Sequence, residues 1–168
     1  MKNMKLMRTI PNKQLTKNYT LWEMIEGQLP ENGKKMNWSN IHQMDISKIQ
    51  EAAEHAQVIR DLINKEFQSD ISTNEIRLRI NSGWRCRDWE LHQKRSGNSQ
   101  HVIAAYDATP INCSPELAAK IIAWLYGRFG RSYMGGLAIK DPTIQNGIVL
   151  SAGFIHFDFR GRVARWKY

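Results

Sequence analysis

Hydrophobic and polar residues alternate most regularly near the C-terminal end of the chain, in residues 153–161. A strand presents successive side chains to opposite faces of its sheet. One face would carry Ile155, Phe157 and Phe159, and the other His156, Asp158 and Arg160. The first set is bulky and apolar, as expected of side chains that pack on a core. The second set combines an imidazole, a carboxylate and a guanidinium, so the segment is either an edge strand with a charged outer face or part of a functional site.

Two other segments show the apolar spacing that indicates an amphipathic helix. The first covers residues 47–67 and is expected to begin with a capping box formed by Ser47 and Gln50. It contains His55, which we expect at a surface or an interface rather than as a ligand. The second covers a segment that follows Ser114, an expected N-cap, and it has proline at its first position.

Shorter elements fill the rest of the chain. A helical turn is expected after Thr20, which can form a capping box with Glu23, and a short helix or turn is expected at 87–94. Strands are predicted at 76–80, 102–108, 133–139, 147–152 and 153–161, with loops or turns at 28–40, 70–74 and 97–100. Because helices come early and strands cluster late, the pattern predicts an α+β domain with a mostly antiparallel sheet.

Composition places few further limits on the fold. The chain has 168 residues, 42% of them hydrophobic, which suits a domain with a core and no disulfide framework. A polar, basic arm is expected at 1–17, before a single domain at 18–168. No apolar run has the length of a signal peptide or a membrane span, so we expect synthesis in the cytoplasm. The two cysteines, Cys86 and Cys113, are too few for a disulfide framework, so we expect a reducing compartment or no redox role.

The net charge of +8 predicts an anionic partner, either nucleic acid or an anionic polymer such as a bacterial wall. The basic residues are scattered along the sequence and form no recognition helix, zinc finger or RNP signature. Nucleic acid is therefore the less favoured partner, and charge alone does not identify one.

A second polar cluster supplies residues of the kind that bind metal ions. A catalytic zinc ion takes three ligands from His, Asp, Glu and Cys side chains and keeps an open position. His101 and Asp107 can supply two ligands, and His156 can supply a third from the C-terminal strand. Cys86 or Cys113 could act as a soft ligand, although a buried thiol is the commoner role of a free cysteine.

Four motifs occur in the order that is typical of one enzyme family. They are Asn-Tyr-Thr-Leu-Trp-Glu at 18–23, Ser-Gly-Trp-Arg at 82–85, Ser-Gln-His at 99–101 with Asp107, and Phe-Ile-His-Phe-Asp-Phe-Arg-Gly at 154–161, with Ala-Arg-Trp at 164–166. With these motifs the chain resembles the zinc D-Ala-D-Ala carboxypeptidase-like family, bacterial and phage enzymes that cut peptidoglycan peptides. The resemblance covers residues 18–166, which makes it more specific than any single motif.

The resemblance implies a hedgehog/D-Ala-D-Ala-peptidase-like fold, with helices packed on one side of a central sheet. It implies Zn2+ held by His101, Asp107 and His156. It also implies that Arg85 binds a peptide carboxylate or carbonyl, and that Asp158 orients a ligand or transfers protons. The residues expected beside the substrate include Trp84, Ser99 and Gln100.

Two features depart from the family pattern. The segment between His101 and Asp107 is one residue shorter and lacks a glycine, so a bulge is expected to aim Asp107 at the metal. Relatives in the wider group place a carboxylate base three residues before the last histidine, where this chain has Gly153. The general base is therefore unassigned.

The first hypothesis is a zinc peptidase that hydrolyses peptidoglycan stem peptides or cross-links and is encoded by a phage. It would be made in the host cytoplasm and would reach the wall after release or as part of a virion, beside phage structural proteins. The alternative from another class is an inactive structural protein of a virion or tail on the same fold. A nucleic-acid binder is suggested by charge alone.

Overall fold

The computed structural model describes residues 10–68 and 75–168. Its helices are α1 (Leu21–Glu26), α2 (Glu31–Asn40), α3 (Gln43–Phe67), α4 (Arg87–His92) and α5 (Pro115–Phe129), with a short 3₁₀ helix at Gln100–Val102. Its strands are β1 (Arg77–Ser82), β2 (Ala105–Ile111), β3 (Gly136–Lys140), β4 (Thr143–Gln145), β5 (Ile148–Ser151), β6 (Phe154–Asp158) and β7 (Ala164–Lys167). The turn predicted at 70–74 lies outside the described residues.

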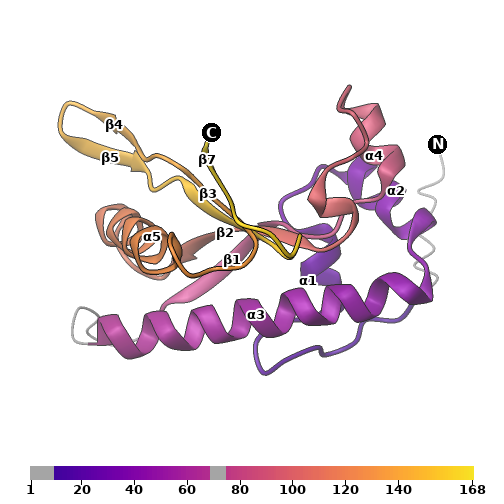
Figure 1. Ribbon diagram of the computed structural model, residues 1–168, viewed down its shortest axis with the longest axis horizontal. Helices are drawn as coiled ribbons and strands as arrows, with labels where there is room; N and C mark the ends of the chain where they lie inside the picture. The colour runs from indigo at the N-terminus through magenta and orange to yellow at the C-terminus, as the bar shows by residue number, and fades with distance from the viewer. Residues whose placement is uncertain (1–9, 69–74) are drawn as a thin grey trace, which may run out of the picture.

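Strands β1, β2, β6, β3 and β7 form one mixed sheet, in that order. Neighbouring strands in it are antiparallel, except for β3 and β7, which are parallel. Strands β4 and β5 form a separate hairpin that projects beyond α5 (Figure 1). For the described residues, the prediction of an α+β fold with a mostly antiparallel sheet is confirmed.

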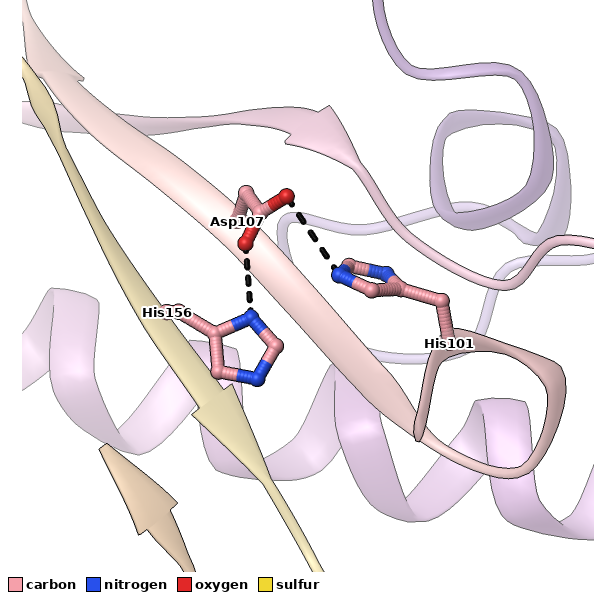
Figure 2. Close-up of side chains that lie close together, drawn as sticks. All are labelled: His101, Asp107 and His156. Atoms are coloured by element: carbon pink, nitrogen blue, oxygen red, sulfur yellow. Dashed lines mark hydrogen bonds and ion pairs between the residues drawn. The ribbon is translucent and has the colours of Figure 1, made fainter. Parts of the chain in front are cut away.

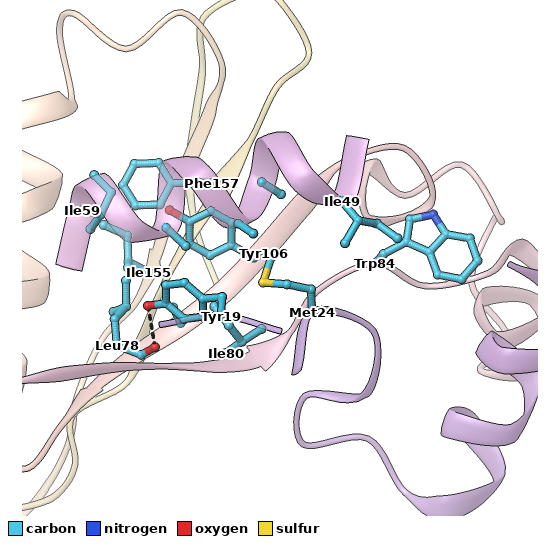
Figure 3. Close-up of a cluster of buried hydrophobic side chains, with 14 of the residues drawn as sticks. Tyr19, Met24, Ile49, Ile59, Leu78, Ile80, Trp84, Tyr106, Ile155 and Phe157 are labelled. Carbon is cyan, nitrogen blue, oxygen red and sulfur yellow. Dashed lines mark hydrogen bonds between the residues drawn. The ribbon is translucent and has the colours of Figure 1, made fainter. Parts of the chain in front are cut away.

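The hydrophobic core lies on the face of this sheet that α3 and α5 cover. His55 of α3 and Phe129 of α5 both contact the ring of Phe157, with ring centroids 4.9 and 6.0 Å from it. Tyr106 and Ile155 point into the same core and, like Phe157, are fully buried (Figure 3). Burial of each such side chain contributes about 1.5–3 kcal/mol. The apolar face predicted for residues 153–161 is therefore the core face.

Residues 28–40 were predicted to be a surface loop, and this prediction is wrong because most of them form α2. Tertiary contacts favour the helix despite weak local preference. Asn37 is fully buried, and its amide group donates to Trp84 O and accepts from Cys86 N. Gly33 lies against the indole of Trp89, where a Cβ atom would come within 2.9 Å of the ring.

Helix α3 begins five residues earlier than predicted, counted from N-cap to N-cap. Its N-cap is His42, and the capping-box partner is Asp45, whose carboxylate accepts from His42 N at 2.8 Å. Ser47 instead lies inside the helix and donates to Met44 O. The capping boxes or N-caps predicted at Thr20 and Ser114 are present.

Strands β4 and β7 were not predicted from the sequence, because they are only three and four residues long. Strand β7 is held by Arg165, whose guanidinium donates to the backbone carbonyls of Gly130 and Gly135. At the other end of the chain, Leu15 is buried and Gln14 forms a β-bridge with Thr20, so this part of the expected arm packs on the domain. Among the described residues, no helix is long and apolar enough to cross a membrane.

Candidate metal centre

The site is built on the polar face of β2 and β6, opposite the core. Asp107 and His156 are directly opposed in the register of these antiparallel strands. Side chains of an opposed pair lie on the same face of the sheet, so the carboxylate and the imidazole meet without further adjustment. Their neighbours Tyr106 and Phe157 are opposed on the core face.

His101 reaches the same point from the segment before β2. The 3₁₀ helix at Gln100–Val102 is capped by Ser99, whose hydroxyl accepts from His101 N at 3.3 Å. This tight turn stands where extended backbone was predicted from residue 102. It lets the short segment after His101 bring both His101 and Asp107 to the same site. The bulge expected before Asp107 is not formed where β2 pairs with β6, since residues 105–108 keep an unbroken register there. A register shift occurs in β1, between Ile80 and Ser82, and Ser82 pairs with Asp107.

The three side chains form a compact group in which each contributes one ligand atom and these atoms lie within 4.8 Å of one another. Asp107 lies between the two histidines (Figure 2). Its Oδ1 is 2.7 Å from Nδ1 of His156, and its Oδ2 is 3.3 Å from Nε2 of His101. Both histidines are 2% exposed, so water contributes little to the stabilisation of a charge on either ring.

The proton of His101 is assigned by its second contact. Nδ1 lies 2.7 Å from the carbonyl oxygen of Gly83, which can only accept, so Nδ1 must donate. In the neutral ring, Nε2 then carries a lone pair. This buried atom makes no hydrogen bond among the described residues, although Oδ2 of Asp107 is close. Two lone pairs that face each other in a buried site fit a bound cation between them.

Asp158 supports the third member of the group. Its Oδ2 is 3.2 Å from Nε2 of His156, and it also binds the guanidinium of Arg160. Its Oδ1 accepts from the backbone N–H of Gly136 at 2.9 Å. Gly136 cannot be replaced without a clash, because a Cβ atom there would lie 2.1 Å from Oδ2 of Asp158.

Burial and charge act in opposite directions on these groups. Burial lowers the pKa of His101, and Asp107 offsets only part of this effect. Burial also opposes the charge of His156, but hydrogen bonds with Asp107 and Asp158 outweigh it and raise the pKa of His156. Burial would raise the pKa of Asp107, yet the two histidines hold that pKa well below its usual range. The centre therefore contains an ionised carboxylate beside a neutral His101.

The group lies in a cleft of about 810 Å³ with two chemically different sets of lining residues. Guanidinium groups in the lining come from Arg85, Arg95, Arg160 and Arg162, and aromatic rings come from Phe154, Trp166 and Tyr168. On β3, the small Ala138 lies between His156 and Trp166 in the sheet register, so the two rings approach to 5.1 Å. A second cavity, of about 430 Å³, lies between α1 and β1 and contains none of the three candidate ligands.

The structure brings most of the predicted site residues to this cleft. Arg85, Ser99 and Gln100 line it, and Nη2 of Arg85 is 3.4 Å from Oγ of Ser99. Trp84 does not line it, since its side chain is buried in the core beside Ile49 (Figure 3). A contact between Trp84 and substrate therefore stays a prediction.

Neither cysteine belongs to the candidate ligand group. Cys86 is buried and caps α4, with Sγ accepting from Trp89 N at 3.3 Å, and Cys113 is half-buried. His55 lies at the interface between α3 and the sheet, as expected, with Nδ1 2.7 Å from the hydroxyl of Tyr106.

Several contributors to the site were missed by sequence reasoning. They are the carbonyl of Gly83, the backbone of Gly136, the carboxylate of Glu90 and the ring of Tyr168. The Gly-Gly pair at 135–136 was the one feature of the sequence that could have indicated a backbone contribution. The other backbone contributors give no signal, because a backbone atom can contribute whatever the side chain is.

No family model, curated protein or solved structure matches this chain. The function must therefore be inferred from the geometry of the site.

Proposed function

We propose that this chain is a zinc-dependent peptidase that hydrolyses peptide bonds of bacterial peptidoglycan. The fold would be of the hedgehog/D-Ala-D-Ala-peptidase type that the sequence motifs resemble. Two features of the structure support it: the α+β fold and the His-Asp-His group, which could hold a metal ion. Carboxypeptidase and endopeptidase action both fit an open cleft.

One observation carries the proposal: the buried Nε2 of His101 faces the carboxylate of Asp107 while its Nδ1 proton is committed to Gly83. With His156 as the third ligand, the set has the composition of a catalytic zinc site with room for a fourth group. A zinc ion held there would act as a Lewis acid that polarises a peptide carbonyl and activates water.

The surrounding residues have separate tasks in this proposal. Asp158 would orient His156 by accepting from Nε2, which would leave Nδ1 of His156 to bind the zinc ion. The Asp158 carboxylate already accepts from Gly136 and Arg160, which favours orientation over proton transfer as its role. Arg85 extends donors into the cleft, where a guanidinium suits a carboxylate or carbonyl of the peptide.

The charge of the cleft agrees with the proposed substrate. Four guanidinium groups line it, and the chain has a net charge of +8. Stem peptides bear free carboxylates and the wall is anionic, so long-range attraction would favour both. An origin in a phage, synthesis in the host cytoplasm, action on the wall after release or within a virion, and contacts with phage structural proteins belong to the same proposal.

A second candidate is a structural virion protein on the same fold without hydrolytic activity. Gly153 favours it, because this residue stands where wider relatives place a carboxylate base. Gly153 has φ of +76°, and a Cβ atom would lie 2.0 Å from the carbonyl oxygen of Lys140. No side chain can occupy that position, so any general base must come from elsewhere in the cleft.

The test is digestion of purified peptidoglycan by the zinc-loaded protein, with released peptides identified by mass spectrometry. The His101→Ala variant is the matched control, because it removes one ligand from the segment before β2 and leaves the sheet intact. We expect peptide release by the parent protein and none by the variant. Zinc binding without any release would favour the structural alternative.

A further inference from the structure

Glu90 is a buried carboxylate in the wall of the cleft that the candidate metal centre does not use. It lies in the first turn of α4, and its side chain is 1% exposed. One oxygen, Oε1, lies 3.0 Å from Nε of Arg85 and 2.9 Å from Nη1 of Arg95. A single oxygen therefore holds two guanidinium groups together.

The other carboxylate oxygen indicates that this arrangement lowers the stability of the fold. Oε2 of Glu90 is buried and has no hydrogen-bond partner among the described residues. Leaving a buried charged acceptor unsatisfied is unfavourable, and buried ion pairs often stabilise a fold no more than apolar side chains of the same size. Folding stability alone is therefore a weak reason for a carboxylate at this position.

The contact has a clear geometric effect on Arg85. Glu90 forms an ion pair with Nε of Arg85 whose geometry falls short of a hydrogen bond, and the side chain of Arg85 is only 11% exposed. The terminal nitrogen Nη2 has a long contact of 3.4 Å with Ser99. The backbone N–H of Arg85 donates to the carbonyl of His101, which ties Arg85 to a candidate metal ligand.

We propose that Glu90 is a positioning residue that fixes the guanidinium of Arg85 for substrate binding and draws Arg95 to the same wall. This inference rests on the proposed peptidase function. With Nε in an ion pair with Glu90 and Nη2 in only a long contact with Ser99, the terminal nitrogens of Arg85 remain available to bind the substrate. Arg95 is half-exposed, so it adds charge at the cleft entrance with less positional control.

The experiment measures KM and kcat of the zinc-loaded protein for a synthetic stem pentapeptide that ends in two D-alanines. The Glu90→Gln variant keeps the size of the side chain and removes its charge. We expect KM to rise about 10-fold, because a small misplacement of a binding group has effects of this order or larger. Zinc content should stay at the parent value, and the Arg95→Gln variant should show a smaller rise in KM.

The exposed Glu51→Gln variant on α3 controls for the lost charge, and its KM and kcat should equal those of the parent. A fall in kcat with unchanged KM in Glu90→Gln would show a merely structural role and overturn the inference. An unchanged KM and kcat would overturn it as well, while leaving the peptidase function in place. No hydrolysis by the parent protein at full zinc loading would refute the proposed function, and the inference with it.

Discussion

The two faces of strands β2 and β6 hold histidines in opposite chemical surroundings. On one face, His156 lies between the carboxylates of Asp107 and Asp158. On the other face, His55 packs among aromatic rings and contacts the hydroxyl of Tyr106 at 2.7 Å. Strand alternation separates these settings by a single residue step, from His156 to Phe157.

Burial has different effects on the histidine pKa at the two faces. Burial lowers the pKa of His55 to about 4, because no charged partner compensates for the lost hydration. Burial acts in the same direction on His156, but the two carboxylates outweigh it and raise the pKa. A buried histidine therefore does not mark a metal site by itself, whereas His156 is a candidate ligand because a carboxylate and a second histidine lie within ligand distance of it.

The largest effect on the polar face is expected from Gly136→Ala. The added Cβ would lie 2.1 Å from the Asp158 carboxylate, which hydrogen bonds to His156 and Arg160 hold in place. We expect a loss of about 3 kcal/mol in the free energy of unfolding, measured with urea. Zinc affinity should fall in the same variant, because His156 loses its orienting partner.

Gly127→Ala is the control for this glycine substitution. Gly127 lies within α5, and a Cβ atom there would meet nothing within 4 Å. Alanine should stabilise the protein by about 0.5–1 kcal/mol, because glycine is unfavourable inside a helix. Equal effects of the two variants would contradict the tight packing described around Asp158.

On the core face, His55 should make the protein sensitive to acid. The pKa of His55 is about 4 in the folded state and 6.5 in the unfolded state, so the unfolded state binds the proton first. This contribution is fully present above pH 6.5 and is lost as the pH falls towards 4. Between pH 7.5 and 4.5, the parent should lose about 2 kcal/mol more stability than His55→Gln.

Urea unfolding at several pH values measures this difference. His92→Gln controls for the loss of an imidazole, since His92 is exposed at the end of α4. Parallel pH profiles for the parent and His55→Gln would show that His55 is protonated as readily in the folded state as in the unfolded state.

A smaller and more specific effect is expected from Asp158→Asn. The amide can no longer accept from His156 and Arg160 as a carboxylate does, so the orientation of His156 is weakened. Loss of such a supporting contact typically lowers metal affinity about 10- to 100-fold. Competition with a chelator measures this affinity, and the exposed Asp141→Asn variant should bind zinc like the parent.

The polar and apolar faces of residues 153–161 could be predicted from the sequence because strand alternation is strictly local. The meeting of Asp107 with His156 could be expected only in outline, since it depends on the register of two distant strands. Helix α2 was missed because contacts such as those of Asn37 across the core, and not local preference, favour it.

The supporting groups of the site were beyond sequence reasoning for a different reason. Gly83 and Gly136 contribute through their backbone atoms, so the identity of the residue does not indicate a role in the site. Glu90 lies in a short helix whose sequence resembles any charged surface segment, and its burial and its ion pairs with Arg85 and Arg95 depend on the tertiary structure.

The most direct test of the comparison is the zinc content of the purified protein beside His156→Ala and His55→Ala. The account predicts about one zinc ion per chain in the parent and in the folded His55→Ala protein, and none in His156→Ala. Absence of zinc from the parent after loading, or its retention in His156→Ala, would contradict the assignment of a metal centre to the polar face.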